Sequence, residues 1–459
     1  MRLGLRKVSP SKLAVGLLLL YLGIIETEGA LRWMLASISG ESLIYLRDLL
    51  PPLGIWLALR RQPNGRRNFV FLLIGVQLAI ASVVGYYFSG SLAQVIFGLR
   101  MFVPFIFAVA MYSAIYEEWT FFGLGCAVLL GIGSAGVILN QYFQFPWIGA
   151  DFKAFDMTVE LSREWIELGG RERLPGFSRA SYDAATQISF FVVIALFAVR
   201  RTLPRLLLAA VGFYAVYLTT SKTSIGCLTQ LLANFLVLEM IPGIPSLGFF
   251  GRGLRRFGIT ALRLQIALIT IACVVLPLQT RDTLKVVEGD LREDSTFHLL
   301  SIQDRAANIW PMTFEYIQQK GNYFLGVGMG GLGTALDLFG KSDTSMPGDN
   351  SFVYMYGIFG LIVIVYFGAF VWMSFSKRLM SAETSTVFGL LALSIAVQGV
   401  TKTTIEGSFD SMALGLVVAH FAFGGKRQKI VPAVKAPDPQ VIAEVTPSEP
   451  TTLIATSTV

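Results

Sequence analysis

Histidine and cysteine are scarce in this chain of 459 residues, which has two histidines and three cysteines. The cysteines, Cys126, Cys227 and Cys273, lie far apart and in separate apolar runs. Disulfide frameworks and zinc sites need paired or closely spaced ligands. We therefore expect no disulfide framework, no metal site and no bound cofactor, and we interpret the three thiols as small core side chains.

Charged residues are also few, at 15% of the chain, whereas soluble domains carry about 25%. Hydrophobic residues make up 54%, and the mean hydropathy is +0.62. A helix of roughly 20 apolar residues crosses a membrane core of about 30 Å, because it satisfies its own backbone hydrogen bonds where water is absent. This composition predicts a polytopic helical membrane protein without a soluble catalytic domain.

The net charge of +7 does not indicate nucleic-acid binding, because no basic face with interleaved aromatic residues stands outside the apolar runs. The basic residues cluster instead in short loops between those runs, as they do in the cytoplasmic loops of membrane proteins. We therefore expect the lipid bilayer, and no nucleic acid, among the partners of this chain.

The fold class that we expect is all-α, a polytopic transmembrane helix bundle of about 12 spans with two long outer loops. The spans lie near residues 13–25, 42–59, 69–88, 92–115, 119–140, 184–199, 206–219, 223–241, 264–279, 350–375, 384–400 and 408–424. Basic residues precede the first span, as they would in a signal peptide, but no small-x-small cleavage site follows it. Glu26 and Glu28 come directly after this run, so we expect a retained first helix.

Lysine and arginine indicate the orientation of the bundle. They cluster at residues 60–67, 200–205, 252–263, 377–378 and 426–429. All these clusters fall on the cytoplasmic side if the amino terminus lies inside, and twelve crossings return the carboxyl terminus to that side. The loop at 116–118 is an exception, since it should be cytoplasmic but has no lysine or arginine.

This topology places two long polar segments, 141–183 and 280–349, outside the cytoplasm. They belong to a transmembrane catalytic bundle of residues 1–430. Residues 431–459 are rich in proline, threonine, alanine and valine without periodicity, which predicts a disordered cytoplasmic tail. Any chemistry must come from the two outer segments and from polar residues among the helices.

Short surface helices are expected in both outer segments. Residues 302–317 follow helical spacing and predict one or two helices against the membrane or the bundle. Pro311 would kink such a helix or start a second one, and Gly321 would end it. A further surface helix in the first outer segment is suggested by Phe155, Val159, Trp165 and Ile166.

Residues 326–333, Gly-Val-Gly-Met-Gly-Gly-Leu-Gly, formally contain a G-x-G-x-x-G pattern. No preceding strand or βαβ unit accompanies it, so we do not expect nucleotide binding. Two interpretations stay open. The loop is either a turn that packs closely against neighbouring backbone, or a place where bare backbone N–H groups approach a substrate phosphate.

Charges also occur inside the predicted spans. Arg100 lies about eight residues from the outer end of its span, roughly 12 Å deep at 1.5 Å per residue. A charge at mid-bilayer costs about 2.5–3.5 kcal/mol on insertion scales, so it faces a cavity or a partner. Arg100 would therefore meet a diphosphate or pair with an acid. Arg47 and Asp48 are adjacent and point in different directions, so each needs a partner elsewhere.

Several segments, taken in order, resemble the bacterial O-antigen ligase and polymerase superfamily of polytopic glycosyltransferases. The resemblance covers roughly residues 170–375 and rests on three stretches. They are Ser178-Arg179-Ala180-Ser181; Ser221-Lys222-Thr223 before a span; and a composite of Arg305, Trp310, the 326–333 loop and Asp349-Asn350-Ser351-Phe352, which opens a span containing Gly357 and Gly360. Such ligases typically carry a histidine where this chain has Asp349, and often an arginine where it has Lys222. The first difference favours a polymerase of exopolysaccharide or O-antigen repeats.

The resemblance implies a protein of the bacterial inner membrane that works on its extracytoplasmic face. It would move saccharide from a polyprenyl-diphosphate carrier to a hydroxyl of an acceptor saccharide, and other polysaccharide-assembly membrane proteins would be further partners. The departing diphosphate needs its negative charge stabilised, and no close Asp-x-Asp pair for magnesium occurs in the outer segments. A cation about 4 Å from a phosphate oxygen gains roughly 4 kcal/mol at an effective dielectric near 20. The candidates for substrate contact are Arg305, Arg179, Lys222, Arg100 and Asn350.

The acceptor hydroxyl needs a base or an orienting acceptor. Asp349 is predicted at a helix start among apolar residues, where it would cap the helix, act as the base, or both. His298 in the outer loop stays a second candidate, whereas His420 is interpreted as a packed core residue on the cytoplasmic side. Lys402 and Glu406, in an outer turn, are interpreted as solvated.

Three other function classes stay open. An O-antigen ligase acting on a lipid-linked core would share the same features. A secondary transporter or flippase for an anionic solute should show internal repeats and broken helices in matched positions, and no convincing repeat is present. A non-enzymatic membrane partner in an envelope assembly is the last.

Overall fold

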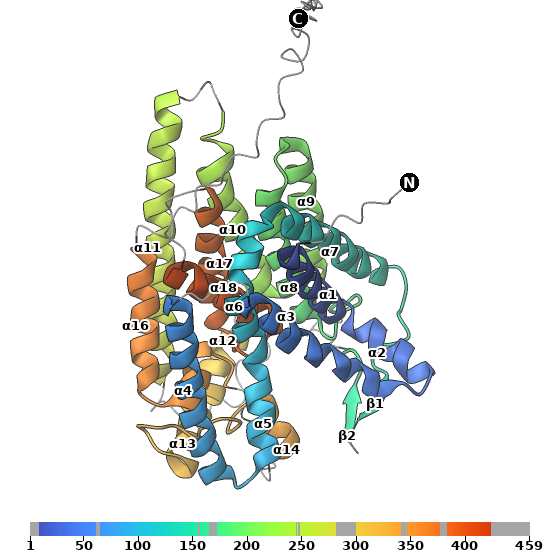
Figure 1. Ribbon diagram of the computed structural model, residues 1–459, viewed down its shortest axis with the longest axis vertical. Coiled ribbons are helices and arrows are strands. Elements are labelled where there is room, and N and C mark those ends of the chain that lie inside the picture. Colours follow the sequence, from blue (N-terminus) through green and yellow to red (C-terminus); the bar gives the residue numbers. More distant parts are fainter. Residues whose placement is uncertain are drawn as a thin grey trace, which may run out of the picture. The chain divides into compact units, whose positions relative to one another are not determined.

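The computed structural model of the protein describes residues 9–60, 65–154, 157–164, 172–244, 246, 248–280, 300–340, 346, 348–376 and 383–423. Helices dominate this part of the chain (Figure 1). The first half contains α1 (Pro10–Glu26), α2 (Glu28–Ser37), the 3-10 helix η1 (Glu41–Leu49), α3 (Leu50–Leu59), α4 (Gly65–Ser89), α5 (Leu92–Met101), α6 (Val103–Glu117), α7 (Trp119–Asn140), α8 (Ser181–Ala198) and α9 (Thr202–Leu218). The second half contains α10 (Lys222–Phe235), the π-helix η2 (Leu236–Met240), α11 (Gly248–Thr280), α12 (Leu300–Asp304), the π-helix η4 (Arg305–Ile309), α13 (Trp310–Lys320), α14 (Thr334–Phe339), α15 (Ser351–Phe359), α16 (Ile362–Ser374), α17 (Glu383–Gly399) and α18 (Ser408–Phe423).

Seven of the described helical stretches are long and apolar enough to cross a membrane, or eight if α1 and α2, which are bent by 78°, form one span. They coincide with eight of the expected spans, and shorter apolar helices coincide with the other four. The long apolar helices are those of a multi-pass helical membrane protein. The count of twelve crossings stays a prediction.

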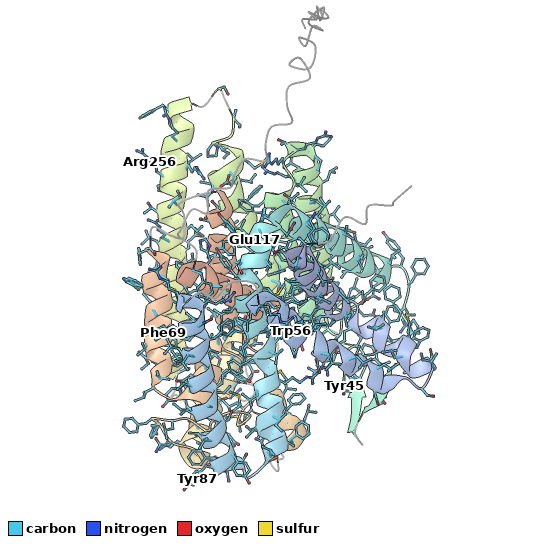
Figure 2. The ribbon with its side chains drawn as sticks, in the orientation of Figure 1. Tyr45, Trp56, Phe69, Tyr87, Glu117 and Arg256 are labelled. Atoms are coloured by element: carbon cyan, nitrogen blue, oxygen red, sulfur yellow. The ribbon has the colours of Figure 1, made fainter. Side chains whose placement is uncertain are left out.

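Large apolar side chains cover the outside of several helices. On α4, the side chains of Phe69 and Tyr87 are 60% and 80% exposed, and they lie towards opposite ends of the helix (Figure 2). The face of α4 that carries Leu78 and Ala81 is buried instead. An exposed apolar surface of this extent is typical of a protein that meets lipid or another partner.

The first outer segment differs from its prediction. Over its described residues it contains an antiparallel pair of strands, β1 (Asp151–Ala154) and β2 (Met157–Glu160), and no helix. The prediction of a surface helix here was therefore wrong for Val159, which lies in β2; Phe155, Trp165 and Ile166 lie outside the described residues. Four-residue strands are too short for their alternation to be distinguished from helical spacing by pattern alone.

The second outer segment contains the expected helices. Residues 300–320 form α12, η4 and α13 without a break in the helical backbone, and Pro311 stands in the first turn of α13, directly after the π-helical turn η4. Gly321 follows as the C-terminal cap, as predicted. The indole of Trp310 is 1% exposed and belongs to an apolar core that also contains Phe352 and Tyr354 of α15. This core underlies the candidate site.

The glycine loop 326–333 is buried and packs against helix backbones. Gly326, Gly328, Gly330 and Gly333 have φ between 65° and 80°, a region that favours glycine. The Met329 N–H donates to the carbonyl of Ala81 at 2.7 Å, and the Val327 N–H donates to that of Gly357 at 2.6 Å. These contacts support the close-packing interpretation, because most of the N–H groups in the loop donate to protein carbonyls and are not free for a phosphate.

Candidate functional site

The starts of several other helices lie around the turn at residues 400–407, which connects α17 to α18. The Ser351 hydroxyl of α15 donates to the carbonyl of Lys402 at 3.0 Å. The hydroxyl of Thr401 donates to that of Thr223 in α10 at 3.1 Å. Near the start of α8, Thr186 accepts from Lys402 Nζ at 2.6 Å. Because the N-terminus of a helix carries partial positive charge, α8, α10, α15 and α18 each direct partial positive charge towards this end of the bundle.

Asn350 fixes α15 against this turn. Its side chain is 0% exposed, and Oδ1 accepts from the N–H groups of Phe352 and Val353 at 2.8 and 3.1 Å, which makes Asn350 the helix cap. Its Nδ2 donates to the carbonyls of Cys273 and Val400, both at 3.1 Å.

The bond to Cys273 has a specific cause. Residue 277, one turn later in α11, is proline, so the Cys273 carbonyl lacks its usual intrahelical N–H partner. The Asn350 amide satisfies that carbonyl and thereby links the Pro277 turn of α11 to the starts of α15 and of the 400–407 turn. The contacts show a positioning role for Asn350; a direct contact with substrate stays a prediction.

Asp349 precedes the cap and faces a cation. Its φ is +27°, which is unusual for a residue other than glycine. Arg305 Nε, at the start of η4, lies 3.2 Å from Asp349 Oδ2, and the two side chains are 23% and 28% exposed. Burial raises the pKa of Asp349 above its ordinary value, and the nearby Arg305 guanidinium lowers it in part. The structure thus brings together two predicted site residues that are 44 positions apart in the sequence.

Lys402 is not simply solvated, and that prediction was wrong. Its Nζ lies 2.6 Å from Asp410 Oδ2, and the Asp410 side chain is 4% exposed. Asp183 of α8 interacts electrostatically with Lys402, with Arg179 and with Asp410. The sequence signal that could have found this pair is Asp410 itself, since a charge within an apolar run needs a partner.

Glu406 is not simply solvated either. Its Oε1 accepts from the N–H of Thr334, at the start of α14, at 2.9 Å and from the hydroxyl of Tyr354 at 3.2 Å. Burial raises the pKa of Glu406 to about 7, although both hydrogen bonds oppose that rise. A carboxyl with a pKa near neutral pH, next to a helix start, is a candidate proton acceptor that sequence reasoning missed.

A chain of ion pairs extends from this region through α2 and η1. Glu28 Oε2 lies 2.6 Å from Arg47 Nη1, and Glu28 Oε1 lies 2.5 Å from Arg32 Nη2. Asp48 Oδ2 in turn lies 2.8 Å from Arg100 Nη2. Arg47 and Asp48 thus each have a partner elsewhere, as expected, and Arg100 pairs with an acid. Arg47 Nε also lies 3.7 Å from Asp48 Oδ1, so the expectation that these two side chains point in different directions was wrong.

Arg179 connects the ion-pair chain to the rest of the site. It is half-buried, and it interacts electrostatically with Glu28 and Arg32 on one side and with Asp183 on the other. Sequence reasoning missed Glu28 and Arg32 as parts of this cluster. Glu28, directly after the first apolar run, was the available signal.

The remaining predicted residues lie close to the same turn or away from it. Lys222 is exposed at the first position of α10, next to Thr223. His420 is packed in the core, where Nδ1 lies 2.8 Å from the Tyr112 hydroxyl and the ring stacks on Phe388. His298 lies outside the described residues. Among the described residues, no three histidine, cysteine or acidic side chains are grouped as a metal site requires.

No protein-family model matches the chain, and no curated protein is significantly similar to it.

Proposed function

We propose that the chain is a membrane glycosyltransferase of the O-antigen ligase and polymerase type. It would transfer saccharide from a polyprenyl-diphosphate carrier to a sugar hydroxyl, most simply to polymerise exopolysaccharide or O-antigen repeats. The observation that carries this proposal is the ion pair between Arg305 and Asp349 at the start of α15. It places a cation beside a partly buried carboxylate, at an end of the bundle where four apolar helices begin.

The pair suits the two demands of the reaction. As the anomeric C–O bond breaks, its electrons leave with the diphosphate, and a guanidinium can bind that anion through two hydrogen bonds. The acceptor oxygen forms the new glycosidic bond, and its proton passes to a carboxylate. Arg305 is assigned the first task and Asp349 the second.

The two tasks are coupled through the same ion pair. Arg305 holds the pKa of Asp349 below the level that burial alone would give. A donor diphosphate that draws the guanidinium away would therefore raise the basicity of Asp349 at the moment when the acceptor hydroxyl must lose its proton. Arg179 and Lys222 extend the positive surface around the same turn for the carrier or the sugar.

The proposed setting is the bacterial inner membrane, with about twelve crossings and both termini in the cytoplasm. The described arginines at 200, 201, 252 and 256 are exposed in loops or at helix ends that the topology assigns to the cytoplasm. The turn 400–407 then belongs to the extracytoplasmic face, where assembled lipid-linked saccharides would arrive.

A flippase for a lipid-linked anion is the second candidate, and one observation favours it. The α1–α2 pair is broken by 78° directly before Glu28, which pairs with two arginines. Broken helices with charges at the break are typical of transporters.

The deciding experiment uses purified protein in nanodiscs with a polyprenyl-diphosphate-linked repeat unit. A ladder of products indicates a polymerase, and a single addition to a lipid-linked core indicates a ligase. An Asp349→Asn variant serves as the matched control, because asparagine is isosteric and tolerates positive φ. If no glycosidic product forms but carrier crosses a vesicle bilayer, the transferase proposal is wrong.

A further inference from the structure

The N-terminal end of α11 extends beyond the end of α16 and carries exposed arginine and phenylalanine side chains. The helix has 33 residues, about 50 Å at 1.5 Å per residue, whereas a bilayer core is about 30 Å thick. Arg263 Nη2 donates to the carbonyl of Ser376, just after the end of α16, at 3.4 Å. Residues 248–262 therefore continue about 22 Å past that level.

The side chains on this projecting part combine charge and aromatic surface. Phe249, Phe250 and Phe257 are 86%, 65% and 69% exposed. Arg252 and Arg256 are exposed as well, and they stand four positions apart, so that their guanidinium groups lie on one face of the helix. Figure 2 shows Arg256 on the outside of this end of α11.

Arg252 and Arg256 differ from the other arginines of α11. Arg255 lies 3.5 Å from Glu239, and Arg263 bonds the Ser376 carbonyl. Within the described residues, no acid or carbonyl pairs with the side chain of Arg252 or Arg256. Two adjacent guanidinium groups without a protein partner can bind a phosphate from two sides.

The surroundings of these arginines identify the phosphate. Phe257 begins an exposed apolar stripe that continues along α11 through Leu264, Leu268 and Ile271, which are 46%, 64% and 46% exposed. An exposed apolar stripe on a membrane-spanning helix is expected to face lipid tails, so we infer that the headgroups begin near its Phe257 end. Exposed phenylalanine and arginine at that depth are typical of segments that lie at an anionic membrane surface.

We propose that Arg252 and Arg256, flanked by Phe249, Phe250 and Phe257, form a binding site for the phosphate headgroups of anionic phospholipids. This site lies on a different element from the candidate active site and is independent of the proposed function. It anchors the α10–α11 hairpin to an anionic leaflet.

The test measures how anionic lipid changes the stability of the full chain. Purified protein in a neutral detergent is titrated with phosphatidylglycerol or with phosphatidylcholine, and the apparent affinity is obtained from the rise in Tm. We expect a rise with phosphatidylglycerol only. Arg252→Gln with Arg256→Gln should weaken that affinity roughly 30-fold, from about 1 kcal/mol for each arginine near an anionic surface.

Arg200→Gln with Arg201→Gln is the matched control, since it removes the same charge from an exposed pair outside α11. The loss of lipid affinity in this control variant should be less than a third of the loss in the Arg252→Gln, Arg256→Gln variant. Equal losses in both double variants would show a general charge effect and overturn the proposal, as would an unchanged affinity in the α11 variant. A change of oligomeric state with no change in lipid affinity would mean that the patch binds a second copy of the chain, and would equally overturn it. All the substituted side chains are exposed, so the variants should keep the wild-type Tm without lipid.

Discussion

Replacing Asn350 tests how the candidate site is held in place. In Asn350→Ala, α15 loses its side-chain cap, which costs about 1 kcal/mol. The carbonyls of Cys273 and Val400 lose their donor, and a buried polar group left without a partner costs about 1–3 kcal/mol. The free energy of unfolding should therefore fall by about 3–7 kcal/mol.

Asn350→Asp separates the two contributions. An aspartate can still accept from the N–H groups of Phe352 and Val353, but it cannot donate to the two carbonyls and would place negative charge beside them. It should be at least as unstable as Asn350→Ala. Asn308→Ala is the control. Asn308 is exposed, and its amide donates to Asp304 Oδ1 alone among the contacts described for it. This substitution should change the free energy of unfolding by no more than about 0.5 kcal/mol.

The role of the proline can be isolated with a double-mutant cycle. Pro277→Ala restores an N–H one turn after Cys273, so the Cys273 carbonyl regains a helical partner. Asn350→Ala should then cost about 1–3 kcal/mol less in the Pro277→Ala background. The measurement is equilibrium unfolding in mixed micelles. Wild-type stability in Asn350→Asp, or strict additivity in the cycle, would refute the account in which Asn350 bonds the Cys273 carbonyl that Pro277 leaves without a helical partner.

Further predictions concern the reaction and its pH dependence. Arg305→Ala should lower polymer yield about 10²–10³-fold, and Asp349→Asn should lower it about 10²–10⁴-fold. Both variant proteins should still insert in the membrane. Full activity in either variant would show that the substituted residue has no role in the mechanism. The pKa of Glu406 is about 7 in the folded protein, against an ordinary value of 4.5. Between these two pH values the folded state therefore binds more protons than the unfolded state. The free energy of unfolding should accordingly decrease as the pH rises from about 4.5 to 7. Thermal unfolding across pH 4–8 should show this slope in the wild type and a smaller one in Glu406→Gln; identical slopes would show that Glu406 does not titrate as described. Activity should persist in a metal chelator, and a loss restored by magnesium would overturn the role given to the cationic side chains.

The sequence predicted the helices better than their contacts. Each expected span coincides with a helix or helix pair because runs of apolar residues and helix-ending glycines are local signals, as Pro311 and Gly321 illustrate around α13. The strands β1 and β2 were missed because four residues give too little periodicity to identify.

The sequence indicates that a charge inside an apolar run needs an ion-pair partner, but it does not identify that partner. Arg100 inside an apolar run was expected to meet a diphosphate or an acid, and the acid that it meets, Asp48 of η1, lies 52 positions away. The hydrogen bond from Asn350 to the Cys273 carbonyl depends in the same way on a proline, Pro277, that lies 73 positions earlier in the sequence. Such contacts are set by tertiary packing, which no local pattern specifies.

The ion pairs also restrict how an anionic substrate could bind. Arg305 faces Asp349, Lys402 faces Asp410 and Arg100 faces Asp48. At these three positions each cation is already paired with a carboxylate. A diphosphate that binds one of these cations must therefore displace the carboxylate. Each displacement costs the pair's own attraction and leaves a carboxylate with greater affinity for a proton. Solvent screens the attraction more at the partly exposed Arg305–Asp349 and Arg100–Asp48 pairs than at Lys402–Asp410, where the carboxylate is buried. Of the first two pairs, only Arg305–Asp349 would release its carboxylate at the start of α15, where the proposed acceptor hydroxyl must be deprotonated.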